Sequence, residues 1–225
     1  MDQIRLNKFL AERLGFSRRE ADELIASGKV MVNQKPAVIG SRISKDDLVT
    51  YDNREIPFSA DFIYLAMNKP VGYVCSRRSQ GNTPTLYELL PKEYLKLKTV
   101  GRLDKDSSGL ILLTNDGDFA FQMTHPKFHK EKVYEVRLNR SLEPLHQQMI
   151  SDYGVMLDDG ASKFLVIKTN PDLNEYNVVL TEGRNRQIRR TFAALGYKVT
   201  SLHRIKFGKY ELSGLAAGKY VTIKP

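Results

Sequence analysis

One ten-residue stretch, residues 101–110, holds the side chains with the strongest potential for chemistry in this chain. It reads GRLDKDSSGL and places Asp104 in a short polar segment directly before an apolar run. A carboxylate at such a junction can be a catalytic group with Arg102 beside it. The same residues also fit an ordinary polar turn that leads into a buried strand.

A calcium-binding loop is a third interpretation of this stretch. Four residues match the first, third and fifth ligand positions and the glycine of such a loop: Asp104, Asp106, Ser108 and Gly109. The twelfth position, however, is Asn115 where a bidentate glutamate is required, and residues 110–113 are all apolar. We therefore discard the calcium interpretation.

A second stretch, EGRNRQIRR at residues 182–190, concentrates positive charge. Asn185 can cap a helix whose apolar stripe includes Ile188. Within that helix Arg186, Arg189 and Arg190 would share one face, where like charges repel unless anions hold them. Phosphates or a carboxylate are the expected partners, and a plain solvated helix is the alternative.

A third stretch is the strand-like KVYEV at residues 132–136, whose Tyr134 lies between two valines. By sequence alone such a tyrosine is most often part of the core. His125 and His129 have the spacing of neighbours on a helix, but Pro126 disfavours a helix there and no third metal ligand is evident. We expect these histidines to be structural.

The overall charge favours a polyanionic partner. The chain has 225 residues, a net charge of +9 and a pI near 9.5, which fits nucleic-acid binding. No apolar run is long enough to span a membrane and the first residues do not resemble a signal peptide. The single cysteine, Cys75, excludes an internal disulfide. We expect a cytoplasmic protein.

Two regions must position these side chains. Residues 1–58 carry a net charge of only +1 and predict two helices within residues 4–27, the second opened by a capping box of Ser17 and Glu20. Short strands follow at 30–32 and 48–51, and residues 51–61 read as a linker.

The second region, residues 62–225, predicts an α+β fold on a mixed, largely antiparallel sheet with flanking helices, because strands outnumber helices without regular alternation. A half-buried strand is expected from Ile63 to Met67. The other expected strands are 110–114, 132–138, 164–168, 176–181, 198–204 and 220–223. The expected helices are 86–90, 119–124, 144–152 and 185–195.

Residues 5–37, RLNKFLAERLGFSRREADELIASGKVMVNQKPA, resemble the small alpha-L RNA-binding module first seen in a ribosomal protein. The matching positions are Ser17, Arg18, Ala21, Leu24, Ile25, Gly28, Val30, Val32 and Asn33, with Gln34 in place of the usual glycine. The resemblance implies that residues 1–58 bind RNA. The exposed basic residues expected to do so are Arg5, Lys8, Arg18 and Arg19.

GRLDKDSSGLILLTNDG, KVYEV and EGRNRQIRR follow one another in the order and spacing of the pseudouridine synthases that act on ribosomal RNA. MNKPVGYVCS before them and GYKVTSLHRIKFG after them extend the resemblance over nearly the whole chain. The branch of this family that the chain resembles carries an N-terminal alpha-L module. The resemblance implies an α+β catalytic domain at residues 62–225 that isomerises single uridines.

The resemblance also implies a role for particular residues. Asp104 corresponds to the catalytic aspartate, Arg189 to the basic residue that pairs with it, and Tyr134 to an aromatic residue that faces the uracil. Ile188 would be an apolar wall, and Arg102 would fill the gap left when the nucleotide flips out. Whether the aspartate attacks C1′ of the ribose, adds to the base or removes a sugar proton stays open.

Other expectations follow from the same resemblance and from the basic cluster. Arg186 and Arg190 are expected to contact RNA phosphates. The reaction involves no redox change, so no cofactor and no metal is required. The partner is expected to be ribosomal RNA or a ribosome assembly intermediate, and the protein is expected to be a monomer.

Alternatives remain at the level of function. A noncatalytic RNA-binding or ribosome-assembly factor would use the same basic surface without needing Asp104. An RNA methyltransferase is disfavoured, because no Gly-rich cofactor loop follows an early strand. Among synthases, the YVCS, LYELLP and SLHR segments favour small-subunit RNA, whereas RNRQIRR is as typical of those acting on the large subunit. We expect small-subunit RNA.

RNA binding by this chain should weaken steeply as salt is added. Contacts between basic side chains and phosphates release counterions, so the logarithm of the binding constant falls linearly with that of the salt concentration. Fluorescence anisotropy with labelled ribosomal RNA fragments between 50 and 200 mM salt measures this slope, expected to correspond to about 4 or more phosphate contacts. A flat titration would contradict an electrostatic interface.

Overall fold

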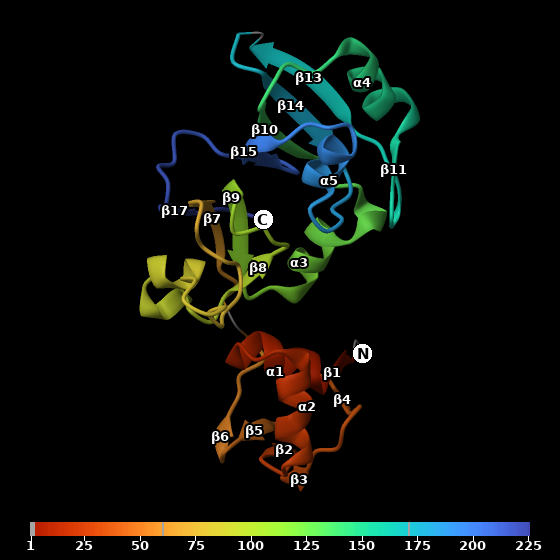
Figure 1. Cartoon of the computed structure of the whole chain (residues 1–225). Helices are drawn as coiled ribbons and strands as arrows, with labels where there is room; N and C mark the ends of the chain where they lie inside the picture. The colour runs from red at the N-terminus through yellow and green to blue at the C-terminus, as the bar shows by residue number, and fades with distance from the viewer. Residues whose placement is uncertain (1–2, 60, 171) are drawn as a thin grey trace.

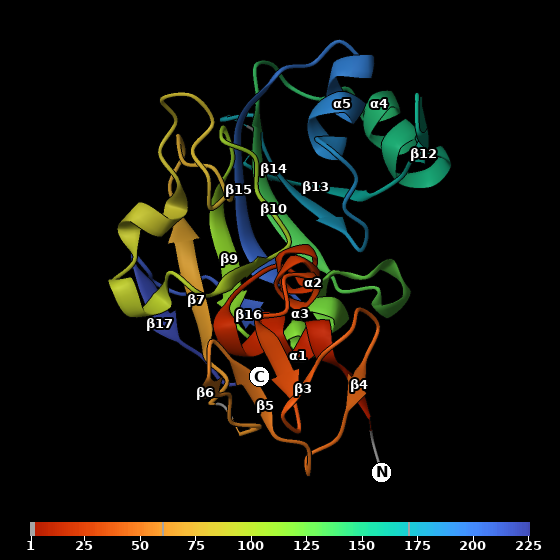
Figure 2. The same cartoon turned by 90° about the horizontal axis from the view of Figure 1, so that it is seen from below.

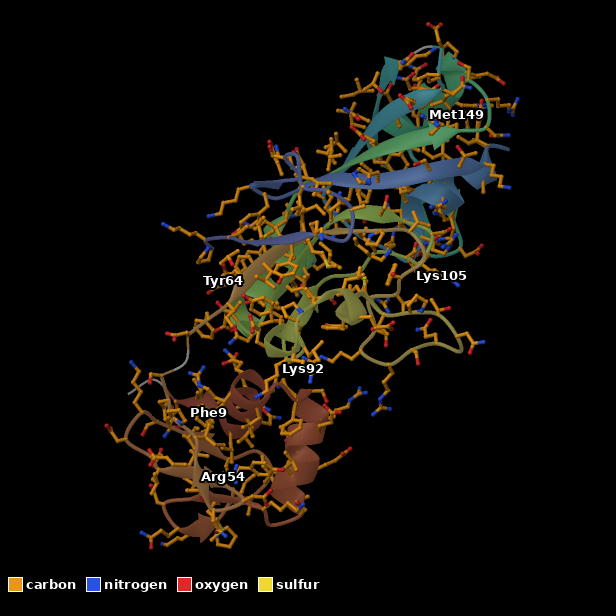
Figure 3. All side chains as sticks on the ribbon, turned by 90° about the vertical axis from the view of Figure 1, so that its left-hand side faces the viewer. Phe9, Arg54, Tyr64, Lys92, Lys105 and Met149 are labelled. Atoms are coloured by element: carbon orange, nitrogen blue, oxygen red, sulfur yellow. The ribbon has the colours of Figure 1, made fainter. Side chains whose placement is uncertain are left out.

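The computed structural model describes residues 3–59, 61–170 and 172–225. It contains a small N-terminal module and a larger region built on one long sheet (Figure 1). Figure 3 places Phe9 and Arg54 in the module, and Tyr64, Lys105 and Met149 in the larger region. Among the described residues, no helix is long and apolar enough to cross a membrane.

The module combines two helices with short strands. Its elements are β1 (Ile4–Arg5), α1 (Leu6–Leu14), α2 (Arg18–Ala26), β2 (Val30–Val32), β3 (Lys35–Pro36), β4 (Arg42–Ile43), β5 (Val49–Tyr51) and β6 (Arg54–Glu55). Strand β1 pairs with β4, and the other four strands form a sheet in the order β3-β2-β5-β6. Two helices and the strands at 30–32 and 48–51 were therefore predicted correctly, apart from one residue at Leu48.

Local chemistry explains both helix ends. Gly15 ends α1 in the left-handed conformation, with a φ of 79°. Ser17 and Glu20 form the predicted capping box at the start of α2, with Glu20 N donating to Ser17 Oγ at 3.2 Å. The apolar faces of the two helices close a core around Phe9, Leu10 and Ile25.

The expected linker at 51–61 was too long. Tyr51 still belongs to β5, and a turn at Asp52 and Asn53 leads into β6. Ile56 is then buried in the core of the module, and Phe58 packs against that core. The polar composition of residues 52–55 marks a hairpin turn here, because both central residues adopt positive φ.

In its described residues the larger region contains nine strands of one sheet, whose central order is β13-β14-β10-β15-β9-β7-β17. They are β7 (Tyr64–Lys69), β8 (Lys98–Val100), β9 (Ser108–Thr114), β10 (Lys132–Leu138), β13 (Leu165–Asn170), β14 (Glu175–Leu180), β15 (Val199–Phe207), β16 (Tyr210–Glu211) and β17 (Tyr220–Thr222). Strand β16 pairs with β15, and β8 with β9. Among the pairs of named strands in the described residues, only β9 and β15 run parallel, so the mixed, largely antiparallel sheet was predicted correctly.

Helices and a separate hairpin cover this sheet (Figures 1 and 2). The helical elements are η1 (Leu86–Leu89), η2 (Lys92–Tyr94), α3 (Gly117–Thr124), η3 (Pro126–Phe128), α4 (Pro144–Gln148), the π-helix η4 (Met149–Tyr153) and α5 (Gln187–Ala194). The hairpin consists of β11 (Val155–Leu157) and β12 (Gly160–Ser162) and was not predicted.

Strand β7 is fully buried, which corrects the expectation of a half-buried strand. Leu65 and Met67 belong to the main core, whereas Ala66 lies in a second apolar cluster on the other face, together with Leu112 and Phe207. The sheet is therefore covered on both faces at this point. The alternating pattern of Ile63, Leu65 and Met67 does not mean that the other face of the strand is exposed.

The parallel contact between β9 and β15 requires a glycine at position 109. A Cβ on Gly109 would lie 2.2 Å from the carbonyl oxygen of Arg204, and Gly109 has a φ of +104°. Both the close approach and the backbone conformation exclude larger residues. Gly109 thus brings the segment around Asp104 against β15.

Gly109→Ala should destabilise the protein by about 3 kcal/mol or more, because it combines backbone strain with a steric overlap in the sheet. Urea unfolding followed by circular dichroism measures the change. The matched control is Gly183→Ala, where a Cβ meets nothing within 4 Å and φ is not positive. The control should stay within about 0.5 kcal/mol of the wild type, and equal stability of both variants would contradict the assignment.

Candidate active site

A cavity of about 330 Å³ opens between the segment before β9, strands β10 and β15, and the loop before α5. Its volume is within the usual range for small-ligand sites. Five residues selected from the sequence line it: Arg102, Asp104, Tyr134, Arg186 and Ile188. Three stretches that are far apart in the chain therefore meet at one site.

Asp104 begins a tight turn at the entrance of β9. The turn is closed by the Ser107 amide, which donates to the Asp104 carbonyl at 3.1 Å. The Asp104 side chain is 35% exposed, so its carboxylate is accessible to a ligand in the cavity. The polar-turn interpretation and the reactive-carboxylate interpretation are thus both compatible with this position.

A fully buried lysine supports the turn from beneath. Lys69 Nζ donates to the carbonyl oxygens of Pro70, Asp104 and Ser107 at 2.9, 3.2 and 2.7 Å. Burial lowers the pKa of Lys69, while the thiol of Cys75 and then the carboxylates of Asp104 and Asp106 act in the opposite direction. The ammonium group is fixed by three carbonyls and therefore holds the turn to the end of β7.

Arg186 is the cation next to Asp104. Its Nη1 lies 3.5 Å from Asp104 Oδ2, and the same guanidinium donates to both oxygens of Asp106 at 2.9 and 3.0 Å. Hydrogen bonds from Arg186 lower the pKa of Asp106, against the effect of burial. Arg186 has a φ of 47° and occupies the N-cap position of α5, so the expected cap at Asn185 was wrong.

Among the described residues Arg189 forms its ion pair with Asp106, while Asp104 acts on its guanidinium only through space, which corrects the expected direct pairing. Its Nη2 donates to the Asp106 carbonyl at 2.8 Å, Nη1 donates to the Val199 carbonyl at 3.0 Å, and Nε lies 3.4 Å from Asp106 Oδ2. The first turn of α5 places Arg189 against Asp106, whose carboxylate also accepts hydrogen bonds from Arg186. Arg189 therefore fixes the turn from behind the cavity.

Carboxylates of the protein itself hold the arginine cluster together. Asp159, in the turn between β11 and β12, accepts two hydrogen bonds from Arg190 at 3.0 and 2.7 Å and one from Arg184 at 3.0 Å. A carboxylate, one of the two partners that the sequence suggested, is therefore present, and the expected phosphate contacts of Arg186 and Arg190 stay a prediction. Arg190 does not line the cavity.

Tyr134 forms part of the cavity wall, and two buried cations lie beside it. Arg204 is its cross-strand partner and is 2% exposed. Arg204 Nη1 lies 3.5 Å from the Tyr134 hydroxyl, and its Nε donates to the Leu110 carbonyl at 2.7 Å. The Nη2 atom is buried without a protein partner among the described residues, so one donor is left for a ligand or water.

Lys132 is the second of these cations. Its Nζ lies 3.3 to 3.4 Å from the carbonyls of Lys130, Thr181 and Glu182 and 5.3 Å from the ring centroid of Phe207. Burial, followed by repulsion from Arg204, lowers the pKa of Lys132 to about 8, while Glu182 opposes the shift. This group links β10 to the loop that carries Arg186.

The basic residues expected in the module have different surroundings. Arg5, Arg18 and Arg19 are exposed. Lys8 instead donates to both oxygens of Asp118, at the start of α3, at 2.6 and 2.7 Å. The module and the larger region are thus connected by an ion pair that uses one of the predicted RNA-binding residues.

Sequence reasoning did not identify Lys69, Lys132 or Arg204. The signal available for Lys132 was its position two residues before Tyr134, which places both on one face of a strand. For Lys69 and Arg204 the direction of the side chain depends on strand pairing, which local sequence does not specify. Among the described residues, no group of three His, Cys, Asp or Glu side chains could hold a metal ion.

Comparisons with known proteins match both parts of the chain. Residues 63–194 match the family described as RNA pseudouridylate synthase, and residues 4–49 match the S4 domain. A crystal structure titled as that of a pseudouridylate synthase superposes with a TM-score of 0.71 and 32% identity, covering 98% of this chain and 96% of that one.

Curated relatives fall into two groups. The ribosomal small subunit pseudouridine synthase A of Pasteurella multocida is 40% identical over 98% of this chain and 96% of its own length. The ribosomal large subunit pseudouridine synthase B of Pseudomonas aeruginosa is 37% identical over 96% of this chain and 58% of its own length.

The free energy of unfolding should depend on pH through the titration of Lys132. Because its folded pKa of about 8 lies below its ordinary value of 10.5, the unfolded chain binds more protons between these pH values. The free energy of unfolding therefore gains a contribution as pH rises from 8 to 10.5, here about 2 kcal/mol.

Urea unfolding of the wild type and of Lys132→Met at pH 7.5 and 10 isolates this contribution, since Lys69 and Lys98, which also have lowered pKa values, are present in both. The wild type should gain stability relative to the variant at the higher pH. The exposed Lys168→Met is the control and should show no such difference. A gap between wild type and Lys132→Met that does not change with pH would contradict the burial of a titrating ammonium group.

Proposed function

The chain belongs to the RNA pseudouridylate synthase family, and from this premise we propose that it isomerises uridine to pseudouridine in ribosomal RNA. The observation that carries the proposal is the accessible carboxylate of Asp104 in a cavity shared with Tyr134 and Ile188. The alternative of a noncatalytic assembly factor gives no reason for an aspartate in this place.

The cavity receives the base of a uridine that has left its helix. Ile188 and Leu202 supply apolar walls, and Tyr134 supplies an aromatic side chain that can stack on uracil. Turning the nucleotide out of its stack costs a few kcal/mol. Arg102, exposed at the rim, occupies the space that the nucleotide leaves behind.

Breaking the bond between N1 of uracil and C1′ of ribose leaves positive character on the sugar. The carboxylate of Asp104 faces this charge and either stabilises it or bonds to C1′. Asp104 acts through its carboxylate in both roles, and Arg186 Nη1 lies 3.5 Å from that carboxylate. C5 of the rotated base then bonds to C1′ and displaces Asp104 if the carboxylate has bonded there. C5 loses its proton near the hydroxyl of Tyr134, and N1 of the base gains one, so the reaction is an isomerisation without net loss of a proton.

The electron pair of the broken bond departs with the base, so negative charge develops on uracil. Lys132 and Arg204 line the same cavity, and Arg204 Nη2 has no protein partner among the described residues. Fixed cations in a partly desolvated site stabilise a developing anion more strongly than water does. These two residues therefore complement Asp104 across the reacting bond.

Arg189 acts on the reaction through Asp106. It binds the carbonyl of Asp106 and lies 3.4 Å from its carboxylate, so it orients the turn that begins with Asp104. We assign to Arg189 a positioning role in place of a direct ion pair with the catalytic carboxylate. Arg190 similarly holds the hairpin of β11 and β12 through Asp159.

The two parts of the chain divide the work. We assign RNA binding to residues 1–58 and catalysis to residues 62–225, in agreement with the S4 match over 4–49 and the synthase match over 63–194. Arg5, Arg18 and Arg19 are exposed and available to phosphates. Lys8 can contribute once the RNA competes with Asp118 for its ammonium group.

Within ribosomal RNA we propose a uridine of the small subunit as the substrate. The 40% identity to a small-subunit enzyme, against 37% to a large-subunit enzyme, supports this choice. We further propose that the protein acts as a monomer in the cytoplasm, on free RNA or on an assembly intermediate. Pseudouridine mapping of both ribosomal RNAs with and without this gene distinguishes the subunits.

Asp104→Asn should lower the rate of turnover at least about a thousandfold, because the neutral amide neither stabilises positive charge at C1′ nor attacks that carbon. RNA affinity should stay within about threefold of the wild type, since the change removes a negative charge from a basic cleft. Carbodiimide-stop sequencing of ribosomal RNA measures turnover, and fluorescence anisotropy measures binding.

Asp158→Asn, on the exposed turn between β11 and β12, is the matched control and should retain full activity. An affinity loss of tenfold or more in Asp104→Asn would contradict the proposed division between binding and chemistry. If Asp104→Asn also restores all cellular functions of a deleted gene, the assembly-factor alternative is preferred.

A further inference from the structure

The surface between the module and the cavity is formed by α3 and the segment that follows it. Asp118, in the first turn of α3, holds Lys8 of the module at 2.6 Å. At the other end, Thr124 and Pro126 line the cavity. A helix of this length measures roughly 12 Å, so α3 bridges the two places where RNA is expected to bind (Figure 1).

Aromatic side chains are exposed along this bridge. Of residues 121–129 only Met123 is buried. Phe121 is 45% exposed and Phe128 is 36% exposed. Their rings pack edge to face with centroids 5.7 Å apart at 90°, and His125 lies 4.7 Å from Phe121. The rings support one another, yet each retains more than a third of its surface for a ligand.

The positive charge of the segment favours a ligand that carries both aromatic bases and negative charge. Lys127 Nζ lies 5.1 Å from the centroid of Phe121 and 4.7 Å from that of Phe128. Residues 121–130 include Lys127 and Lys130 and no acidic residue. Exposed aromatic rings interleaved with cations are the combination that holds single-stranded nucleic acid, because bases stack and phosphates pair.

We propose that Phe121 and Phe128 form a stacking platform for an unpaired RNA base next to the nucleotide in the cavity. The proposal rests on the proposed function, in which RNA spans the module and the cavity. At the mouth of the cavity the platform holds this base apart from the adjacent bases of the RNA strand, and Lys127 neutralises the adjoining phosphate. It selects for single-stranded context around the target, with no requirement for a particular base.

The test compares two labelled 12-mers that differ only in bases: oligouridylate and a ribose-phosphate oligomer without bases. Anisotropy gives the ratio of their dissociation constants for the full-length wild type, for Phe121→Leu/Phe128→Leu and for Phe121→Tyr/Phe128→Tyr. The wild type should prefer the oligomer with bases by about tenfold. The leucine variant should lose about fivefold or more of that preference, and the tyrosine variant should keep it.

Tyr153→Leu is the matched control, because Tyr153 is 76% exposed and lies outside this segment. It should keep the wild-type ratio. The platform is refuted if the wild type shows no preference, or if the leucine variant keeps the wild-type ratio, including the case in which both oligomers weaken equally. Unchanged RNA binding with lost association to ribosome assembly particles would identify the segment as a protein contact and overturn the proposal.

A failure of the proposed function can be distinguished from a failure of the stacking platform. Pseudouridine formation on ribosomal RNA by the leucine variant should show a KM raised about fivefold or more with kcat nearly unchanged, since neither ring lines the cavity. If the wild type forms no pseudouridine, the proposed function fails while the oligomer ratio still decides whether the platform exists.

Discussion

The buried ammonium group of Lys69 is the contact on which the site depends. It is fully enclosed and donates to three backbone carbonyls, one at the end of β7 and two in the turn that begins at Asp104. Removing it would leave those carbonyls without their shared donor, a loss of about 1–3 kcal/mol for each group that becomes unsatisfied. The position of Asp104, the proposed catalytic residue, is therefore set through backbone carbonyls, and its side chain remains partly exposed to the cavity.

Two arginines near the start of α5 differ in their position relative to Asp104. Arg186 lies beside Asp104, binds Asp106 and lines the cavity, while Arg189 binds the same Asp106 and does not line the cavity. Asp159 fixes Arg190 and Arg184 in turn. The like charges of this cluster are thus compensated: the other three guanidinium groups donate to aspartates, and that of Arg189 donates to the carbonyls of Asp106 and Val199.

Patterns that depend on neighbours in sequence were predicted well. The capping box at Ser17 and the strand Lys132–Leu138 are observed at the expected residues, since caps and alternation are local. Asn185 failed as a cap because ion pairs to two aspartates hold Arg186 in the left-handed conformation. Of the three proposed catalytic residues, Asp104 and Tyr134 line one cavity; the direction of Arg189 required knowledge of the turn it faces.

Strand β15 joins the cavity to the opposite side of the sheet through consecutive residues. Arg204 lies beside Tyr134, whereas the imidazole of His203 is 2.8 Å from the hydroxyl of Ser108. Inserting or deleting a single residue just upstream would exchange these two side chains between faces. The spacing from Val199, where β15 begins, to Arg204 is therefore under a geometric constraint that substitution rates alone would not reveal.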